Sequence, residues 1–156
     1  MIENTKNQLA LAATRIFTDD VDALLAFYER VTGVAAHRIH PLFGEIVTPS
    51  GTLAIASTQT VGLLGAGSAE AAANRSVCLD WLVDDVDADH ARLAAIITEF
   101  VAEFGAEFEL GSAAGFVNEP TTMPWGNRSL LLRDPDGNLL NVFTPVTPEA
   151  RARFGM

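Results

Sequence analysis

The sequence of 156 residues contains a single cysteine, Cys78, so no internal disulfide can form. This usage fits the reducing cytoplasm, which is where we expect the protein to reside. No run of about 18 apolar residues is present, so the sequence predicts no membrane-spanning helix. The first residues also lack the basic leader and cleavage site of a secretion signal.

Basic residues are scarce: 10 lysines and arginines stand against 20 aspartates and glutamates, for a formal net charge of -10. Such a chain repels nucleic acid phosphates and anionic membrane surfaces, so we expect neither as a partner. The charge suits a cationic small molecule, but it also serves solubility alone. With 49% apolar and 19% charged residues, the composition is that of one globular domain, which we assign to residues 1–156.

An internal repeat organises the chain. The pentapeptide Asp19–Ala23 recurs as Asp84–Ala88, 65 residues later, and each copy follows a short apolar segment. Each copy also opens a helical pattern, since its acidic residues are good N-caps and apolar residues follow at helical spacing. The periodic residues are Val21, Leu24, Leu25, Tyr28 and Val31 in the first copy, and Val86, His90, Leu93, Ile97 and Val101 in the second.

The repeat predicts an α+β fold built from two tandem βαβββ modules. The first module covers residues 10–58, with strands near 35–40, 43–48 and 52–57 after the helix. The second covers residues 76–146, with strands near 115–119, 128–133 and 138–144. A linker, helical in part at 69–73, spans residues 59–75, and the tail 147–156 is expected to be a short exposed helix.

The turn signals of the second module complete the pattern. Pro124-Trp125-Gly126-Asn127-Arg128 is followed by Asp134-Pro135-Asp136-Gly137-Asn138, a strong hairpin turn, and then by Leu139–Phe143. Together with the duplicated modules, this resembles the vicinal oxygen chelate superfamily of glyoxalases, bleomycin resistance proteins and extradiol dioxygenases, over about residues 10–146. The resemblance implies a cup-shaped mixed sheet with helices on the outside, and a homodimer.

The resemblance also implies where a metal would bind. Metal-dependent members place ligands on the first and last strands of each module, which here fall at Ala13, Cys78, Asn141, and either Ala54 or Ala56. Alanine has no donor atom and a neutral asparagine is a poor ligand, so Cys78 alone cannot hold a hard divalent cation. We therefore expect no metal and no cofactor.

Strand alternation places further residues in the cup. If residues 13, 78 and 141 face it, so do Arg15, Asp80 and Phe143. Arg15 and Asp80 are equivalent by the repeat, and either bind a ligand or form an ion pair with each other. Trp125, on a turn at the lip, is placed to stack on a planar or cationic guest. The predicted ligand-binding residues are Arg15, Phe43, Ala54, Ala56, Cys78, Asp80, Trp125, Asn141 and Phe143.

These observations favour a metal-independent small-molecule-binding protein of the glyoxalase/bleomycin resistance type, which sequesters a drug or metabolite and thereby confers antibiotic resistance. Two alternatives stay open. One is a lyase, isomerase or dioxygenase-like enzyme of the same superfamily that uses Asp80 or Cys78. The other is a structural or regulatory domain without a ligand, because one fold hosts many functions.

Overall fold

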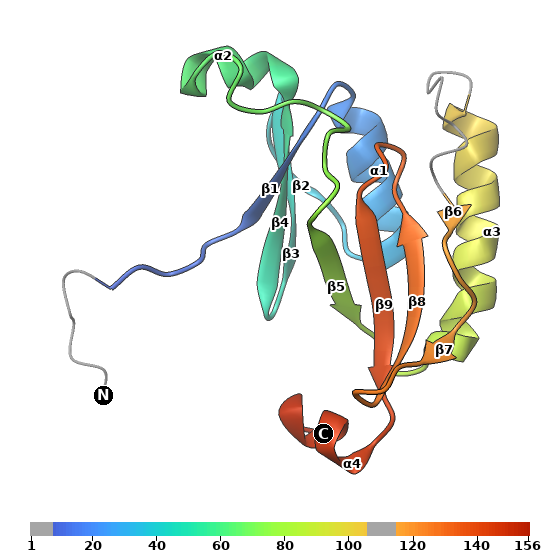
Figure 1. Ribbon diagram of the computed structural model, residues 1–156. Helices are drawn as coiled ribbons and strands as arrows, with labels where there is room; N and C mark the ends of the chain where they lie inside the picture. Colours follow the sequence, from blue (N-terminus) through green and yellow to red (C-terminus); the bar gives the residue numbers. More distant parts are fainter. Residues whose placement is uncertain (1–7, 106–114) are drawn as a thin grey trace.

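The computed structural model describes residues 8–105 and 115–156, which form two open mixed sheets flanked by helices (Figure 1). In the first sheet the strand order is β1-β4-β3-β2, with β1 parallel to β4 and the other pairs antiparallel. Its strands are β1 (Thr14–Thr18), β2 (His37–His40), β3 (Phe43–Thr48) and β4 (Gly51–Ser57). The helix α1 (Val21–Thr32) connects β1 to β2.

The second sheet repeats this plan in the order β5-β9-β8-β6, with the short strand β7 also paired to β8. Its strands are β5 (Cys78–Leu82), β6 (Gly115–Phe116), β7 (Thr121–Thr122), β8 (Asn127–Arg133) and β9 (Leu139–Pro145). The helix α3 (Val86–Phe104) follows β5, and α4 (Pro148–Arg153) ends the chain. The structure confirms the predicted α+β class and the two tandem modules, in each of which a strand and a helix are followed by further strands.

The repeated acidic motif forms the same cap in both modules. Asp20 accepts a hydrogen bond from Ala23 N at 3.0 Å, and Asp85 accepts from Ala88 N at 3.1 Å. Each carboxylate thereby satisfies a backbone N–H that the first helical turn leaves without a partner. Gly33 ends α1 with φ 72°, a left-handed conformation that glycine adopts without strain.

Two local predictions differ from the structure. The linker is helical at Thr58–Thr60 (η1) and Val61–Leu64 (α2), and residues 69–73 are irregular with a turn at 71–72. A helix at 69–73 was predicted from its alanines, but Ala72 has φ 56°, which interrupts any right-handed helix. Of the strand predicted near 115–119, only Gly115–Phe116 forms a strand (β6), and β7 at Thr121–Thr122 was not predicted.

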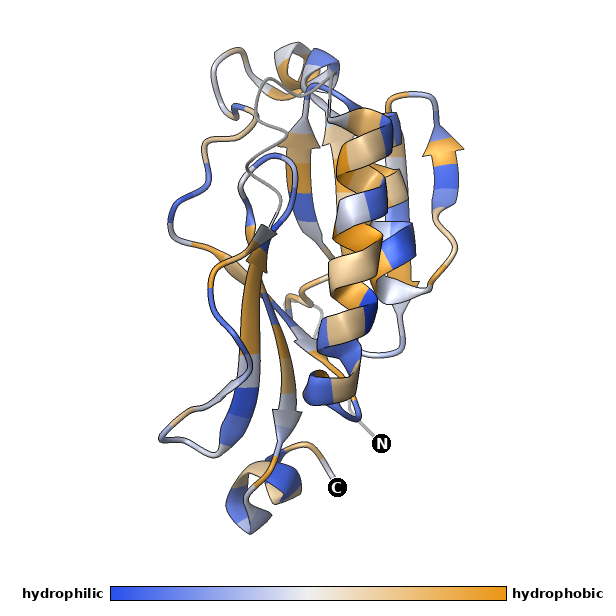
Figure 2. Cartoon of the chain, turned by 90° about the vertical axis from the view of Figure 1, so that its right-hand side faces the viewer, coloured by the Kyte–Doolittle hydropathy of each residue, from blue (hydrophilic) through white to orange (hydrophobic). Residues whose placement is uncertain are grey.

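The alternation of side chains along the strands separates a buried face from an open one. Leu79 and Trp81 on β5 pack against the core beneath the helices, whereas Cys78, Asp80 and Leu82 are exposed on the other face. Leu140 and Val142 on β9 belong to the core on the same side as Leu79 and Trp81. Hydrophobic residues accordingly concentrate along the strands in Figure 2, which looks onto α3.

Two contacts hold the modules together across the helices. Phe27 of α1 and Phe100 of α3, both fully buried, meet edge to face at 5.3 Å between ring centroids. The hydroxyl of Tyr28 donates a 2.7 Å hydrogen bond to Asp134, which lies in the β8–β9 turn of the second module. These contacts fix how the two sheets stand relative to one another. Within the described residues, no helix is long and apolar enough to cross a membrane.

Candidate functional site

A groove runs between the two sheets, where their edge strands β1 and β5 lie beside each other without pairing in the described part of the chain. Its lower part, about 490 Å³, is lined by Thr14, Cys78, Asp80 and the tip of the β3–β4 hairpin around Pro49. Its upper part, about 280 Å³, lies beneath linker residues 69–74. Arg15, Phe17 and Asn138 line that upper part, and Thr14 and Leu79 belong to both. We call the whole the inter-sheet groove.

On the side of the second sheet, three of the predicted site residues converge. Asp80 Oδ1 accepts a hydrogen bond from Asn141 Nδ2 at 3.0 Å, and the thiol of Cys78 lies 3.8 Å from the same oxygen. The strands explain this arrangement, because Asp80 stands opposite Asn141 in the β5–β9 register and Cys78 precedes it on the same face. The Oδ1 atom of Asn141 is buried and has no hydrogen-bond partner among residues 8–105 and 115–156.

The strand register identifies the counterpart of Asn141 in the first module. Asp80 pairs with Asn141, and its repeat equivalent Arg15 pairs with Ala54. Ala54, and not Ala56, therefore occupies the position of the last-strand metal ligand. The four family ligand positions are thus Ala13, Ala54, Cys78 and Asn141.

These residues do not fit the divalent metal of the metal-dependent relatives. Two of the four positions offer no donor atom, and the remaining two offer a thiol and a neutral amide. Across residues 8–105 and 115–156, moreover, no group of three or more His, Cys, Asp or Glu side chains is placed to hold a metal ion.

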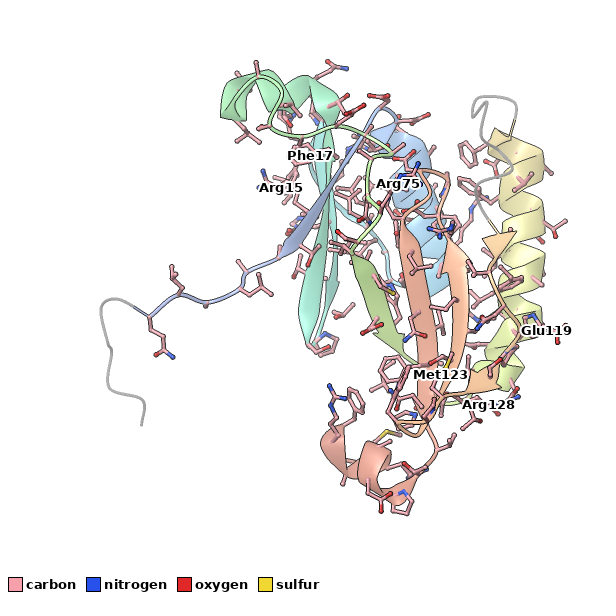
Figure 3. The ribbon with its side chains drawn as sticks, in the orientation of Figure 1. Arg15, Phe17, Arg75, Glu119, Met123 and Arg128 are labelled. Atoms are coloured by element: carbon pink, nitrogen blue, oxygen red, sulfur yellow. The ribbon has the colours of Figure 1, made fainter. Side chains whose placement is uncertain are left out.

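The first sheet contributes a cation and an aromatic ring. The Arg15 guanidinium lies 5.4 Å from the centroid of the Phe43 ring, and no ion pair joins Arg15 to Asp80 within the described residues. Figure 3 shows Arg15 and Phe17 close together on β1. Ala54 and Ala56 on β4 are each 2% exposed, and their side chains extend only one carbon atom from the β4 backbone. Both charged side chains of the predicted site therefore remain available to a ligand.

Sequence reasoning missed Glu45, which stands opposite Ala54 in the β3–β4 register and so shares its face of the sheet. Its carboxylate lies 3.9 Å from His37 Nδ1 on the neighbouring strand. The sequence could have predicted this position, because Glu45 lies two residues after Phe43, which was assigned to the cup, and residues two apart on a strand share a face.

Of the nine predicted residues, Arg15, Cys78 and Asp80 line the inter-sheet groove, and six do not: Phe43, Ala54, Ala56, Trp125, Asn141 and Phe143. Phe143 is 4% exposed because the ring of Phe154, from the C-terminal segment, packs against it at 5.2 Å. Trp125 is 65% exposed on the turn that precedes β8. Neither residue lines the inter-sheet groove.

The environment of Cys78 makes its thiol a weak acid. Burial, the negative charge of Asp80 and the hydrogen bond to that carboxylate raise the pKa of Cys78 to about 11. Because the thiolate is the reactive form, we expect slow alkylation at neutral pH and a rate that rises with pH up to about this value.

The variant Asp80→Asn removes two of these three causes, so we expect the pKa of Cys78 to fall. Alkylation by N-ethylmaleimide at pH 8 should then be several-fold faster than in the wild type, as followed by intact-protein mass spectrometry. Glu149→Gln, which removes an exposed carboxylate of α4, should leave the rate unchanged. Equal rates in all three proteins would show that Asp80 does not act on the thiol.

Comparison with known proteins places this geometry in a family. The family described as Glyoxalase/Bleomycin resistance protein/Dioxygenase superfamily matches residues 10–142. The chain belongs to this superfamily. A search of curated protein sequences finds no match.

Solved structures of superfamily members share the fold. A glyoxalase/bleomycin resistance protein/dioxygenase from Nocardioides is 19% identical, with a TM-score of 0.67 over 90% of this chain and 86% of that one. A family enzyme from Burkholderia phytofirmans is 18% identical, with a TM-score of 0.65 over 86% and 98%. A glyoxalase-related enzyme from Fulvimarina pelagi is 18% identical, with a TM-score of 0.64 over 88% of each chain. At these identities the likeness establishes the fold alone.

Proposed function

We propose that this superfamily member is a metal-independent small-molecule-binding protein that sequesters a drug or metabolite in the inter-sheet groove. One observation carries the proposal. The groove between the modules is open, yet the four positions that the resemblance assigns to metal ligands, of which Cys78 lines the groove, hold Ala13, Ala54, Cys78 and Asn141 in place of a metal-binding set. Binding in such a groove relies on side chains and shape, since the metal that polarises substrates in metal-dependent relatives lacks a sufficient set of donors here.

The chemistry of the groove favours a planar or cationic guest. Asp80 presents an exposed carboxylate, and its Asn141 and Cys78 contacts hold it in place. On the opposite wall, Phe17 supplies an aromatic surface beside Arg15. A flat molecule with a basic group would place its ring between the sheets and its charge against Asp80. Bleomycin-type drugs would fit this description, and antibiotic resistance in the cytoplasm would be the role.

We further propose that the protein works as a homodimer. Leu9 and Leu11, on the segment that leads into β1, are 97% and 92% exposed. The outer edges of β2 and β6, at the far ends of the two sheets, are also unpaired among the described strands. Exposed leucines and free strand edges are both stabilised when a second copy covers them.

Of the two candidate catalytic residues in the enzyme alternative, Cys78 and Asp80, the first is disfavoured. With a pKa of about 11, Cys78 is almost wholly protonated at neutral pH and is a poor nucleophile. Asp80 is the remaining acid or base of the groove. The structural alternative predicts a filled space between the sheets, whereas the groove is open.

A groove-filling variant tests the proposal. Cys78 is exposed and lines the lower groove, so Cys78→Trp fills that space without disturbing the core. Planar cationic and neutral aromatic compounds, screened by thermal shift, should include ligands that bind the wild type at least tenfold more tightly than this variant. Leu63→Trp, at an 88% exposed position of α2, is the matched control and should bind like the wild type. A screen in which no compound distinguishes Cys78→Trp from the control would contradict the proposal.

A further inference from the structure

We propose that a second hollow, which borders the upper part of the inter-sheet groove at Ala72, Asn74 and Val77, binds a small multiply charged anion through Arg75 and Arg133. The hollow measures about 440 Å³ and lies where the end of the linker passes the β8–β9 hairpin. Its walls come from residues far apart in the sequence: Ala72, Asn74, Arg75, Ser76, Val77, Arg133, Asp136, Gly137 and Leu139. Figure 3 shows Arg75 above β5, at the same end of the molecule as this hairpin.

Among the described residues of this strongly acidic protein, both arginines lack a carboxylate partner. Four of the other arginines form one: Arg30 with Glu103, Arg38 with Asp22, Arg92 with Asp89 and Arg128 with Asp87, whereas Arg15, Arg151 and Arg153 form none among the described residues. Within residues 8–105 and 115–156, neither Arg75 nor Arg133 forms an ion pair. In a chain with 20 acidic residues, two unpaired guanidiniums lining one hollow create a local positive potential that an anion would relieve.

The backbone around the hollow is held in place before any ligand arrives. Asn74 accepts hydrogen bonds from Ser76 N at 3.1 Å and Val77 N at 2.9 Å, and its Nδ2 donates to Val77 O at 2.8 Å. Arg75 therefore sits on a fixed turn. Arg133 donates from Nη1 to Gly137 O at 2.9 Å, which anchors its guanidinium against the hairpin. Such anchoring lowers the entropy cost of binding.

The donors that remain define the ligand. The planar guanidinium of arginine binds carboxylate and phosphate in a bidentate manner, and the Ser76 hydroxyl adds a neutral donor. One carboxyl group, that of Asp136, also lines the hollow, and burial raises its pKa. The Asp136 carboxyl and the net charge of -10 both repel an extended polyanion, whose charges would reach beyond the two arginines. The fitting ligand is a compact phosphate or polycarboxylate.

Isothermal titration calorimetry with pyrophosphate and with citrate, at pH 7.5 and low salt, tests this site. We expect saturable 1:1 binding of at least one of these anions to the wild type. Arg75→Gln and Arg133→Gln should each weaken it at least tenfold, with unchanged melting temperatures. Arg151→Gln, at an exposed arginine of α4 that forms no ion pair among the described residues, is the control and should bind normally.

The calorimetry distinguishes between the two classes of anion. Binding of pyrophosphate alone would assign a phosphate ligand, and binding of citrate alone a carboxylate ligand. Absence of saturable binding, or equal affinity in the control and both arginine variants, would overturn the proposal. The groove-filling variant Cys78→Trp should bind these anions like the wild type, so the inference stands or falls independently of the groove.

Discussion

The double variant Cys78→His, Asn141→Asp is expected to bind Zn²⁺ or Ni²⁺ with an affinity on the order of micromolar, whereas the wild type should bind neither appreciably. The physical reason is that the side chains of residues 78, 80 and 141 already lie close together. Asp80 Oδ1 lies 3.0 Å from Asn141 Nδ2 and 3.8 Å from Cys78 Sγ, so the three side chains already meet at one point. The two substitutions surround the Asp80 carboxylate with an imidazole and a second carboxylate, which is the three-ligand set that divalent metals prefer.

The single variants are the controls for this gain. Each adds only one donor beside Asp80, so each should bind metal much more weakly than the double variant, as measured by calorimetry after treatment with a chelator. A double variant as inert as the wild type would show that residues 78, 80 and 141 do not converge in solution. A wild type that binds as tightly as the double variant would show that the metal site uses other residues.

The second large effect is on stability: Asp134→Ala should lower the free energy of unfolding by roughly 3 kcal/mol at pH 7.5. Asp134 is fully buried and accepts hydrogen bonds from Tyr28 Oη, Asp136 N, Asn138 N and Asn138 Nδ2. Alanine leaves these donors without a partner and cuts the link between α1 and the second module. Urea denaturation followed by circular dichroism measures the loss.

The stability deficit of this variant should depend on pH. Burial raises the pKa of Asp134 to about 6 in the folded protein, against about 3.9 in an unfolded chain. The native state then holds the proton more tightly, so the stability that this group contributes is fully present below about pH 4 and is lost as the pH rises to 6. Because alanine does not titrate, the deficit should be about 1 kcal/mol larger at pH 5 than at pH 7.5.

A neighbour in the same turn provides the comparison. Among the described residues, the buried Oδ2 atom of Asp136 has no hydrogen-bond partner, and burial and the charges of Asp19 and Asp20 disfavour its ionised form, against which only the side chain of Thr18 acts. Asp136→Ala should therefore change stability by less than about 1 kcal/mol. Equal losses in the two variants, or a loss below about 1 kcal/mol for Asp134→Ala, would contradict the role given to Asp134.

Much of the fold could be predicted because its signals are local. Asp20, Asp85 and Gly33 act on the helix ends beside them, and the alternation along β5 and β9 follows from backbone geometry. The helix expected at 69–73 failed for a non-local reason. The linker must turn there to pass from one sheet to the other, and the left-handed conformation of Ala72 overrides the helical preference of alanine.

The candidate site could be predicted only within one strand pair. Side-chain alternation and the internal repeat predicted that Cys78, Asp80 and Asn141 share one face, and the structure places them in contact. The groove itself depends on how far β1 stands from β5, which packing between α1 and α3 decides. In the same way, Phe143 is closed off by Phe154, whose position depends on how the C-terminal segment folds back.

Native mass spectrometry of freshly purified, untagged protein, without added metal, tests the central claim most directly, because it reports subunit count, bound metal and bound organic molecules together. We predict a dimer that carries an organic adduct and no metal, and an adduct that Cys78→Trp loses. A stoichiometric divalent metal in the wild type would contradict the account, since the positions Ala13, Ala54, Cys78 and Asn141 could not then be those that define the site.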